Sequence, residues 1–270
     1  MNRMKNRYLY GKTALVTGAT SGIGKVTAER MRDLGYTVWG VSRSAERCEK
    51  DGIIYRPMDV TDSESIRAVL EEIGDFAILV NAAGMGIGGS AEDSDLGLVR
   101  REMETNYYGA VTLTQLALPV MRRNPRSIVI VISSVAARVP LPFQGHYSST
   151  KYALEAHYEA LRIEAKQFGV RVAIIEPGDL STGFTSNRKC AIDETSPYYP
   201  SYSRAIRTIE SDERGGGEPD IIADAVGRIL SRNNPPVRTV CGLKYKVLCF
   251  LMRIFPDRLI LFILGKMYKV

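Results

Sequence analysis

The sequence predicts an α/β protein, a single doubly wound domain with a parallel sheet of about seven strands. Apolar, β-rich runs alternate with helical patterns from Lys12 to about Glu176. The runs are almost continuously apolar, as is typical of strands that are buried on both faces. The alternation therefore indicates one sheet with helices packed against both of its faces.

The strands are identified by their apolar runs and the helices by their periodicity. We expect strands at TALVT, YTVWGVS, GIIYRPM, FAILVNAAG, SIVIVISS, VRVAIIEPG and PPVRTVCG. We expect helices at GKVTAERMRDLG, at residues 64–73 and 106–121, in the stretch that contains Tyr147 and Lys151, and at DIIADAVGRILSR. Thr61 and Glu64 fit a capping box at the start of the second helix. Pro219 is placed to open the last one.

The composition is that of a soluble globular protein, with 45% apolar and 24% charged residues among 270. The chain has two histidines, His146 and His157, and scattered cysteines without a CxxC pair. We therefore expect no metal site, reduced thiols and a cytoplasmic location. The N-terminal stretch MNRMKNRYLYGK has no apolar run behind it, so we expect neither a signal peptide nor a membrane anchor there.

The positive charge is concentrated near the C-terminus. Residues 238–270 contain seven basic residues and one acidic residue, so they carry a charge equal to the +6 of the whole chain. This asymmetry argues against a nucleic-acid-binding body. We expect a catalytic domain over residues 1–242, with a lid at about 179–217, and an apolar, basic helical extension over residues 243–270.

The extension LKYKVLCFLMRIFPDRLILFILGKMYK is interrupted by charges and by Pro256. It therefore cannot cross a bilayer as one apolar helix of about 20 residues. Two interpretations remain. The extension is either a pair of helices packed on the body or on a partner subunit, or an amphipathic element that lies on a membrane surface.

A glycine-rich loop, TGATSGIG, lies between the first strand and the first helix. Gly18, Gly22 and Gly24 permit a tight turn, and the free N–H groups of the helix suit a pyrophosphate. The second strand ends in GVSRS, so Ser42 stands where an acid would bind the ribose hydroxyl of NAD. Arg43 follows it and favours the 2′-phosphate of NADP, with Lys25 adding positive charge.

Six motifs in order resemble the short-chain dehydrogenase/reductase family over roughly Lys12 to Thr182. They are TGATSGIG, NAAG at residues 81–84, Asn106, Ser134, Tyr147 with Lys151, and PGDLST at residues 177–182. The resemblance implies a Rossmann fold, NADP(H) as cofactor, and Asn106, Ser134, Tyr147 and Lys151 as the catalytic residues.

The resemblance also implies a set of cofactor contacts. They are Gly18, Thr20, Ser21, Gly22, Ile23, Gly24, Arg43, Asp59, Val60, Asn81, Ala82, Gly84, Tyr147, Lys151, Pro177, Gly178 and Thr182. Within this set, Asp59 is similar to the adenine contact and Asn81 to a residue that braces the pocket. Pro177, Gly178 and Thr182 are similar to the nicotinamide contacts.

The pair Tyr147 and Lys151 lies four residues apart at a helix start, on one face. A lysine is disfavoured there by the helix dipole, which indicates a use for its charge. Lowering the tyrosine pKa from about 10 by about three units needs roughly 4 kcal/mol. One cation at about 4 Å supplies that at an effective dielectric near 20. We expect Lys151 and the oxidised nicotinamide to make Tyr147 an acid/base, with Ser134 holding the substrate oxygen. Asn106 resembles the residue that keeps a water on the proton path.

The stretch SSVAARVPLPFQGHYSSTKYALEAHYEAL is similar to the branch that contains 17β-hydroxysteroid and retinol dehydrogenases. Phe184, Tyr198 and Tyr199 of the lid are candidates to line an apolar cavity. We therefore expect NADP(H)-dependent interconversion of a hydrophobic, steroid- or retinoid-like secondary alcohol and ketone. The alternatives are a carbonyl or acyl-ketone reductase for smaller substrates, and a catalytically idle dinucleotide-binding redox sensor. The presence of all four catalytic residues argues against the idle sensor.

The expected partners follow from the same reasoning. They are a hydrophobic small molecule, no nucleic acid, a peripheral membrane contact through the extension, and a second copy of the chain in a homodimer or homotetramer.

Overall fold

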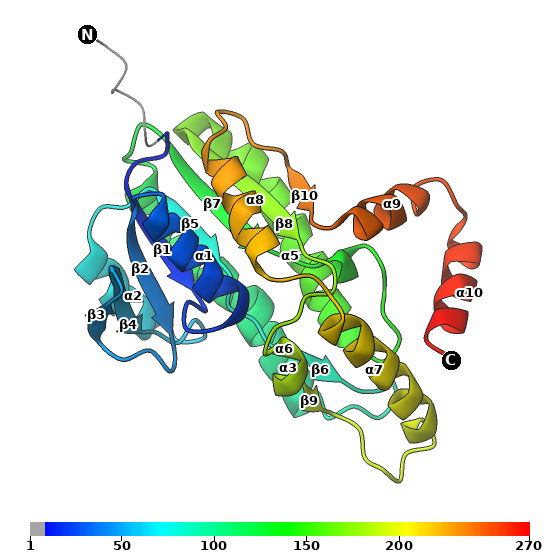
Figure 1. Ribbon diagram of the computed structural model, residues 1–270. Coiled ribbons are helices and arrows are strands. Elements are labelled where there is room, and N and C mark those ends of the chain that lie inside the picture. The colour runs from blue at the N-terminus through cyan, green and yellow to red at the C-terminus, as the bar shows by residue number, and fades with distance from the viewer. Residues whose placement is uncertain (1–8) are drawn as a thin grey trace.

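A central sheet runs through the molecule, and helices cover both of its faces (Figure 1). The computed structural model describes residues 9–270. The strands of the sheet are Thr13–Thr17 (β1), Thr37–Ser42 (β2), Cys48–Lys50 (β3), Ile53–Pro57 (β4), Ile78–Asn81 (β5), Ser127–Ile132 (β7), Val170–Glu176 (β8) and Arg238–Val240 (β10). Their order is β10-β8-β7-β5-β1-β2-β4-β3, so β1 stands where the winding reverses. Ligands bind beyond the carboxyl ends of the strands at such a reversal.

The doubly wound α/β fold is confirmed, and all seven expected strands pair in parallel. The structure adds one strand to this sheet that the sequence did not reveal, β3, which pairs antiparallel with β4 at the edge of the sheet. Its three residues, Cys48, Glu49 and Lys50, show no apolar run. Short polar strands are usual at edges, because an apolar edge would invite pairing with another chain.

Two helical layers sandwich the sheet. The helices on the first face are Gly22–Asp33 (α1) and Asp220–Leu230 (α8). Those on the second face are Ser63–Ile73 (α2), Gly109–Met121 (α4) and Gly145–Glu164 (α5). Short 3₁₀ turns span Val135–Ala137 and Ala165–Phe168. Each layer buries its own apolar cluster against the strands, which holds the carboxyl ends of the strands in fixed positions.

Two helix starts differ from the prediction. The side chain of Asp62, and not Thr61, caps α2 by accepting a hydrogen bond from the Glu64 N–H at 2.9 Å. The helix expected from Asn106 begins earlier, as Leu96–Met103 (α3), where Asp95 is the cap. A π-helical turn, Glu104–Tyr108, joins α3 to α4 and contains Asn106. Such turns are frequent at functional sites, because they displace one residue from the regular helical register.

The segment between residues 179 and 217 contains more regular structure than its polar, turn-rich sequence suggests. It forms Phe184–Asn187 (α6), Lys189–Cys190 (β9) and Tyr199–Arg214 (α7). β9 pairs with Ile87–Gly88 (β6), which follows β5 in the chain. β6 and β9 form a separate two-stranded sheet, which ties the segment to the chain that follows β5.

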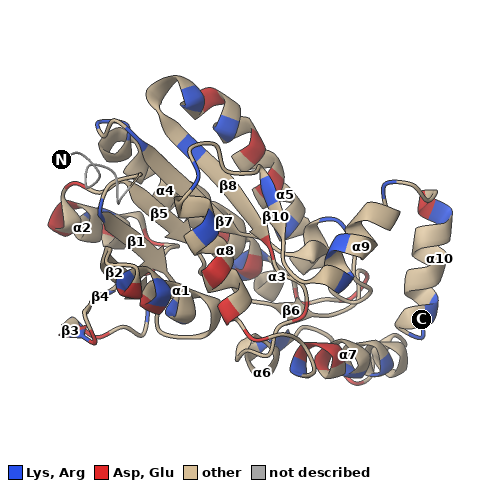
Figure 2. Cartoon of the chain, turned by 45° about the horizontal axis from the view of Figure 1, so that its top comes forward, with Lys and Arg blue, Asp and Glu red and all other residues tan. Residues whose placement is uncertain are grey.

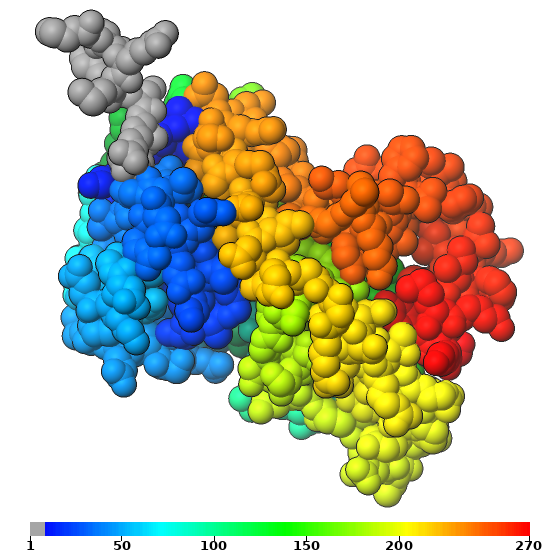
Figure 3. Space-filling model, viewed as in Figure 1, coloured from blue at the N-terminus to red at the C-terminus, as the bar shows by residue number. Residues whose placement is uncertain are grey.

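The C-terminal residues form two helices, Leu243–Leu251 (α9) and Asp257–Met267 (α10), which protrude from one side of the body (Figures 1 and 3). Leu264 and Tyr268 belong to a small apolar cluster with Val139 and residues of α7. Within residues 9–270, no helix combines the length and the apolar character that spanning a bilayer requires. All four cysteines are free.

Candidate active site

A cavity of about 690 Å³ lies beyond the carboxyl ends of the strands. Most of the predicted site residues line it: Gly18, Ser21, Gly22, Ile23, Gly24, Arg43, Ala82, Gly84, Ser134, Tyr147, Lys151, Pro177, Gly178 and Thr182. The predicted residues Thr20, Asp59, Val60, Asn81 and Asn106 are not part of its wall. The structure thus brings the motifs from five separate loops to one place.

The glycine loop leaves room for a ligand against the backbone. Gly18 and Gly22 have positive φ angles of 67° and 49°, which L side chains rarely adopt. A Cβ on Gly24 would lie 2.3 Å from the carbonyl oxygen of Gly18, so only glycine fits there. The first turn of α1 has no acidic residue, and its cap Ser21 makes no side-chain capping bond. The helix N–H groups therefore remain available to a pyrophosphate.

The end of β2 presents hydroxyls and one guanidinium. Thr20 Oγ1 donates to Ser42 Oγ at 3.0 Å, and Ser44 Oγ lies 3.4 Å from Ser42 Oγ. Arg43 is exposed, lines the cavity and makes no ion pair with the described residues. These groups suit an anion and leave no carboxylate where a ribose hydroxyl would bind. The sequence analysis missed Ser44, which the SRS sequence could have suggested.

Two buried side chains, Asn81 and Thr17, hold the loop after β5 in place through hydrogen bonds outside the cavity. Asn81 donates to Thr114 Oγ1 at 3.0 Å and to the Tyr158 hydroxyl at 3.2 Å, so it ties β5 to α4 and α5. Thr17, which the sequence analysis passed over, accepts hydrogen bonds from the N–H groups of Ala82 and Ala83, both at 2.9 Å. The cavity wall at Ala82 therefore depends on residues outside the cavity.

Asn106 fixes the far end of the same loop. Its Oδ1 accepts from the Met85 N–H at 2.8 Å, and its Nδ2 donates to the Met85 carbonyl at 2.8 Å. Nδ2 also contacts Thr150 Oγ1 at 3.2 Å on α5. A Cβ on Gly84 would lie 3.3 Å from Asn106 Oδ1 and 3.9 Å from Lys151 Nζ. Asn106 and Lys151 thus face one narrow space, and the water on the proton path stays a prediction.

Asp59 and Val60 follow β4. The Asp59 carboxylate accepts hydrogen bonds from the N–H and the hydroxyl of Thr61, at 2.9 and 2.8 Å. Val60 is 9% exposed and packs in the second apolar cluster. Their expected contact with the adenine stays a prediction.

The serine and tyrosine lie next to each other. Ser134 lines the cavity and hydrogen-bonds to the phenol of Tyr147. Ser133 also borders the cavity, but its buried hydroxyl donates its hydrogen bond to Glu155 Oε1 at 2.7 Å. The Tyr147 ring packs against Phe184 with 5.5 Å between ring centroids. Ser134, rather than Ser133, is therefore the serine paired with Tyr147, and its contact with a substrate oxygen stays a prediction.

Among the protein's own groups, burial has the largest effect on the pKa of Tyr147, and the combined effect of Lys151 and the oxidised nicotinamide stays a prediction. Burial raises the pKa of Tyr147, and the charges of Glu102 and Glu213 add to the rise. Lys151 Nζ lies 5.7 Å from the ring centroid and donates to the Ile132 carbonyl at 3.1 Å. Burial also lowers the pKa of Lys151 to about 8, which weakens its charge. Desolvation therefore outweighs the single cation.

A buried carboxyl that the sequence analysis missed lies beside this group. Glu102 on α3 is fully buried, and its Oε1 accepts from the Ile87 N–H at 2.8 Å. Burial raises the pKa of Glu102 to about 8, against the opposing charges of Lys151 and Arg188. No motif marks this position, because its burial depends on how α3 packs against β6. Within residues 9–270, no group of His, Cys, Asp or Glu side chains is arranged to hold a metal ion.

The far wall of the cavity is apolar and comes from the C-terminal helices. Leu248 and Met252 of α9 and its following turn line it, together with residues of α10 that include Ile260 and Leu264. Tyr245 packs on Gly178, and its hydroxyl hydrogen-bonds to Asp179.

Of the three aromatic residues expected to line the cavity, only Phe184 does so. The hydroxyl of Tyr198 donates to Glu92 at 2.6 Å, and Tyr199 packs in the third apolar cluster. Both belong to the start of α7, which turns them away from the cavity.

The family relationship is shown by comparison with known proteins. A family model described as short chain dehydrogenase matches residues 12–192. A 3-ketodihydrosphingosine reductase of Bacteroides thetaiotaomicron is 37% identical over 95% of this chain and 97% of that protein. Human retinol dehydrogenase 8 is 29% identical over 88% of this chain and 83% of its own length.

A solved structure has the same fold. A short-chain dehydrogenase from Streptomyces avermitilis superposes with a TM-score of 0.78, at 29% identity over 90% of this chain and 93% of the other. The glycine loop and the free start of α1 fit the nicotinamide dinucleotide that this fold binds. This chain therefore belongs to the short-chain dehydrogenase/reductase family and is an oxidoreductase that acts on CH–OH groups.

Proposed function

We propose that this protein is an NADP(H)-dependent reductase of long-chain lipid ketones. One observation carries the proposal: a single cavity joins the glycine loop, Ser134 and Tyr147 to an apolar wall made by α9 and α10. A hydrophobic substrate fits such a wall, because each buried methylene group contributes roughly 0.8 kcal/mol. The similarity to a 3-ketodihydrosphingosine reductase supports a flexible alkyl chain over the steroid- or retinoid-like skeleton expected from the sequence.

The reaction divides between the cofactor and the chain's own groups. A bound nicotinamide supplies or accepts the hydride. Ser134 holds the carbonyl oxygen by a hydrogen bond, and the Tyr147 hydroxyl transfers its proton to that oxygen. Burial raises the pKa of Tyr147 and so opposes loss of its proton, which means that proton donation depends on the positive charges of Lys151 and of the bound oxidised nicotinamide to stabilise the phenolate. Lys151 stabilises the phenolate that remains. Asn106 holds the loop after β5 through its hydrogen bonds to Met85.

The preference for NADP(H) is proposed from the end of β2. Arg43 is free of ion pairs with the described residues, and the hydroxyls of Thr20, Ser42 and Ser44 lie close to one another. A guanidinium flanked by hydroxyls suits a 2′-phosphate, whereas a carboxylate would repel it. The double substitution Ser42→Asp/Arg43→Leu should weaken NADPH binding by roughly tenfold to a hundredfold, as the loss of a charge-assisted contact predicts.

The activity test uses the purified full chain with NADPH and follows absorbance at 340 nm. The substrates are 3-ketodihydrosphingosine, its analogues with shorter alkyl chains, retinal, a 17-ketosteroid and a small acyl-ketone. We expect kcat/KM to increase about fourfold for each added methylene until the apolar wall is filled. Equal rates for the shortest and longest analogues would contradict the long-chain assignment.

A carbonyl or acyl-ketone reductase for smaller substrates remains the second candidate activity. Faster turnover of the small acyl-ketone than of the long-chain ketones would favour it. A redox sensor would bind NADPH without turning over any of these substrates. The proposed preference for NADPH over NADH is tested separately, by comparing kcat/KM for the two cofactors with the same ketone. A preference for NADH in the unmodified chain would refute the role given to Arg43.

A further inference from the structure

The outer side of the C-terminal helices is an unpartnered apolar surface. Leu243, Val247 and Phe250 lie at spacings of four and three residues, which places them on one face of α9, and Ile254 lies in the turn that follows this helix. Their side chains are 78%, 50%, 61% and 61% exposed. Leu261 and Phe262 of α10 are 56% and 61% exposed. We call these six residues the outer tail surface.

The inner side of the same helices is already used. Tyr245, Leu248 and Met252 line the cavity from α9 and its following turn, and Leu264 and Met267 do so from α10. The helices therefore have apolar residues on two sides, one toward the cavity and one toward solvent. Exposed apolar patches of this extent usually mark an interaction site, since a monomer gains nothing from them.

Positive charges surround the outer tail surface. Residues 243–270 contain Lys244, Lys246, Arg253, Arg258, Lys266 and Lys269, against one acid, Asp257. Figure 2 shows basic positions on α9 and α10, with an acidic position at the start of α10, whereas both signs alternate along α7. The charge that accompanies the apolar residues is thus predominantly positive.

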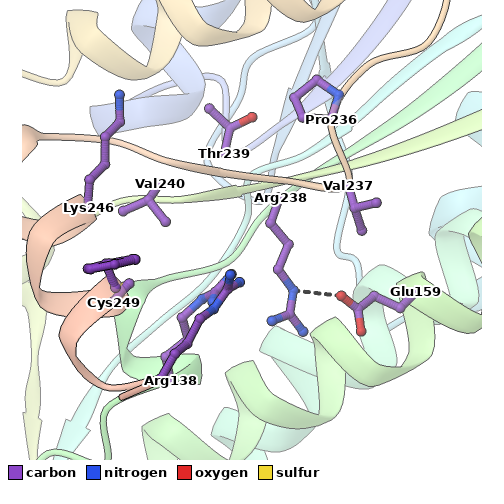
Figure 4. A pocket seen from close by; sticks show the side chains of 11 residues that line it. Arg138, Glu159, Pro236, Val237, Arg238, Thr239, Val240, Lys246 and Cys249 are labelled. Carbon is purple, nitrogen blue, oxygen red and sulfur yellow. Dashed lines mark ion pairs between the residues drawn. The ribbon is translucent and has the colours of Figure 1, made fainter. Parts of the chain in front are cut away.

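A second hollow, of about 710 Å³, opens on the other flank of α9 and has basic walls. Figure 4 shows Lys246, Arg138 and Arg238 around it, with Arg238 paired to Glu159 at 2.6 Å. Arg138 is held by a buried carboxylate, Glu176, at 2.7 Å. Lys246 and Arg253 make no ion pair with the described residues, so their charge remains available beside Phe250.

We propose that the outer tail surface docks the protein on an anionic membrane, with α9 and α10 lying in the interface. A second copy of the chain fits less well, because a two-fold contact through this surface would bring cations against cations. An anionic bilayer satisfies both features, since apolar insertion and cationic attraction reinforce each other. Docking would also bring the apolar wall of the cavity to the lipid in which a long-chain ketone dissolves.

The test is co-sedimentation of the full chain with phosphatidylcholine vesicles in which about one lipid in three is phosphatidylserine. Pure phosphatidylcholine vesicles are the comparison, each at low and high salt. We expect sedimentation with anionic vesicles at low salt, and release at high salt because exposed charges are screened over about 8–10 Å. The assay needs no turnover, so its failure and that of the proposed reaction are distinguishable.

Two full-chain variants separate the two contributions. Val247→Ser/Ile254→Ser/Phe262→Ser removes apolar side chains that line neither hollow, and Arg258→Gln/Lys266→Gln/Lys269→Gln removes exposed cations. We expect the charge variant to bind anionic vesicles roughly tenfold to a hundredfold more weakly, because each cation near the surface contributes up to about a factor of five. Matched controls at exposed positions elsewhere are Leu96→Ser/Ile163→Ser and Lys50→Gln/Arg123→Gln/Lys166→Gln.

The outcomes either support or overturn the proposal. Loss of binding in both tail variants, with both controls unaffected, supports it. A full chain that stays in the supernatant with anionic vesicles at low salt overturns it. An oligomer that the apolar variant dissociates in light scattering, without vesicle binding by the unmodified chain, assigns the surface to a second copy. Circular dichroism of each variant checks that it is folded.

Discussion

Three titratable side chains at the site are pushed toward their neutral forms by burial. The pKa of Tyr147 is raised, that of Glu102 is raised to about 8, and that of Lys151 is lowered to about 8. Near pH 7, Tyr147 and most of Glu102 are therefore protonated and neutral, and Lys151 carries the remaining charge. A buried site tolerates one such cation more easily than three separate charges.

The first prediction concerns Tyr147 and its proton. Tyr147→Phe should abolish turnover but leave NADPH affinity nearly unchanged, because the ring remains and the hydroxyl is lost. Activity is measured by NADPH absorbance, and affinity by quenching of protein fluorescence. Tyr152→Phe is the control, since that side chain lies one residue beyond Lys151 and is 45% exposed. Turnover by Tyr147→Phe at the unmodified rate would remove Tyr147 from the mechanism.

The second prediction concerns Glu102 and the pH dependence of stability. Its pKa is 4.5 when unfolded and about 8 when folded, so the folded state retains a proton that the unfolded state releases between these values. Stability therefore falls as pH rises from 4.5 to 8. Glu102→Gln can keep the bond from Ile87 but lacks this slope. We therefore compare the free energy of unfolding of Glu102→Gln with that of the unmodified chain. The difference, in favour of the variant, should increase by about 1–4 kcal/mol from pH 5 to pH 8.

Urea unfolding at pH 5, 6.5 and 8 measures that gain. Glu104→Gln is the matched control on the next turn, because Glu104 is exposed. The role of Glu102 burial is refuted if the stability curves of Glu102→Gln and the unmodified chain run parallel across this range.

At the scale of elements, the glycine loop and the C-terminal helices define the two ends of the cavity. The loop holds the start of α1 close to β1, and α9 holds Tyr245 on Gly178. Asn106 lies in the π-helical turn that joins α3 to α4. Each end depends on one close approach between a glycine and another element.

The third prediction tests the close approach at the glycine loop. A methyl group on Gly24 would meet the Gly18 carbonyl at 2.3 Å, so Gly24→Ala must displace the loop. We expect a loss of about 1–3 kcal/mol in stability, as overpacking costs, together with a loss of NADPH binding. Gly145→Ala at the start of α5 is the control, since a Cβ there meets no atom within 4 Å. Titration calorimetry and thermal unfolding measure the two effects.

The fourth prediction tests the apolar wall. Leu248→Asn places a polar group in the wall and should lower kcat/KM for a long-chain ketone by about tenfold, while a short analogue is little affected. Ile163→Asn is the control, because Ile163 is 79% exposed on α5. A parallel loss for short and long substrates would mean that Leu248 acts through the stability of the fold.

At the scale of the whole molecule, the apolar clusters separate the body from the C-terminal helices. The two clusters that flank the sheet contain no residue beyond Cys241, whereas the third joins α7 to Leu264 and Tyr268. The sheet and its two layers thus do not need α9 and α10 for their own cores. The cavity does, because its apolar wall comes from them.

The fifth prediction follows from this separation. A chain that ends at Gly242 should unfold in one cooperative transition at a lower Tm and still bind NADPH. It should lose turnover of long-chain ketones, because the apolar wall is gone. Calorimetry and NADPH fluorescence measure these properties. A truncated chain without a cooperative transition would place the helices in the folding core.

The sequence by itself determined the order of the main strands and of most helices between them, the parallel sheet and the positions of the motifs. These follow from hydrophobic periodicity and from the rule that loops after parallel strands meet at one edge. The tertiary structure alone decided which groups are desolvated and what the C-terminal helices face. Glu102 carries no local signal of its burial, and the spacing of Tyr147 and Lys151 does not reveal the desolvation that raises the pKa of Tyr147. Desolvation depends on every element packed around a group, and a sequence pattern describes only one element at a time.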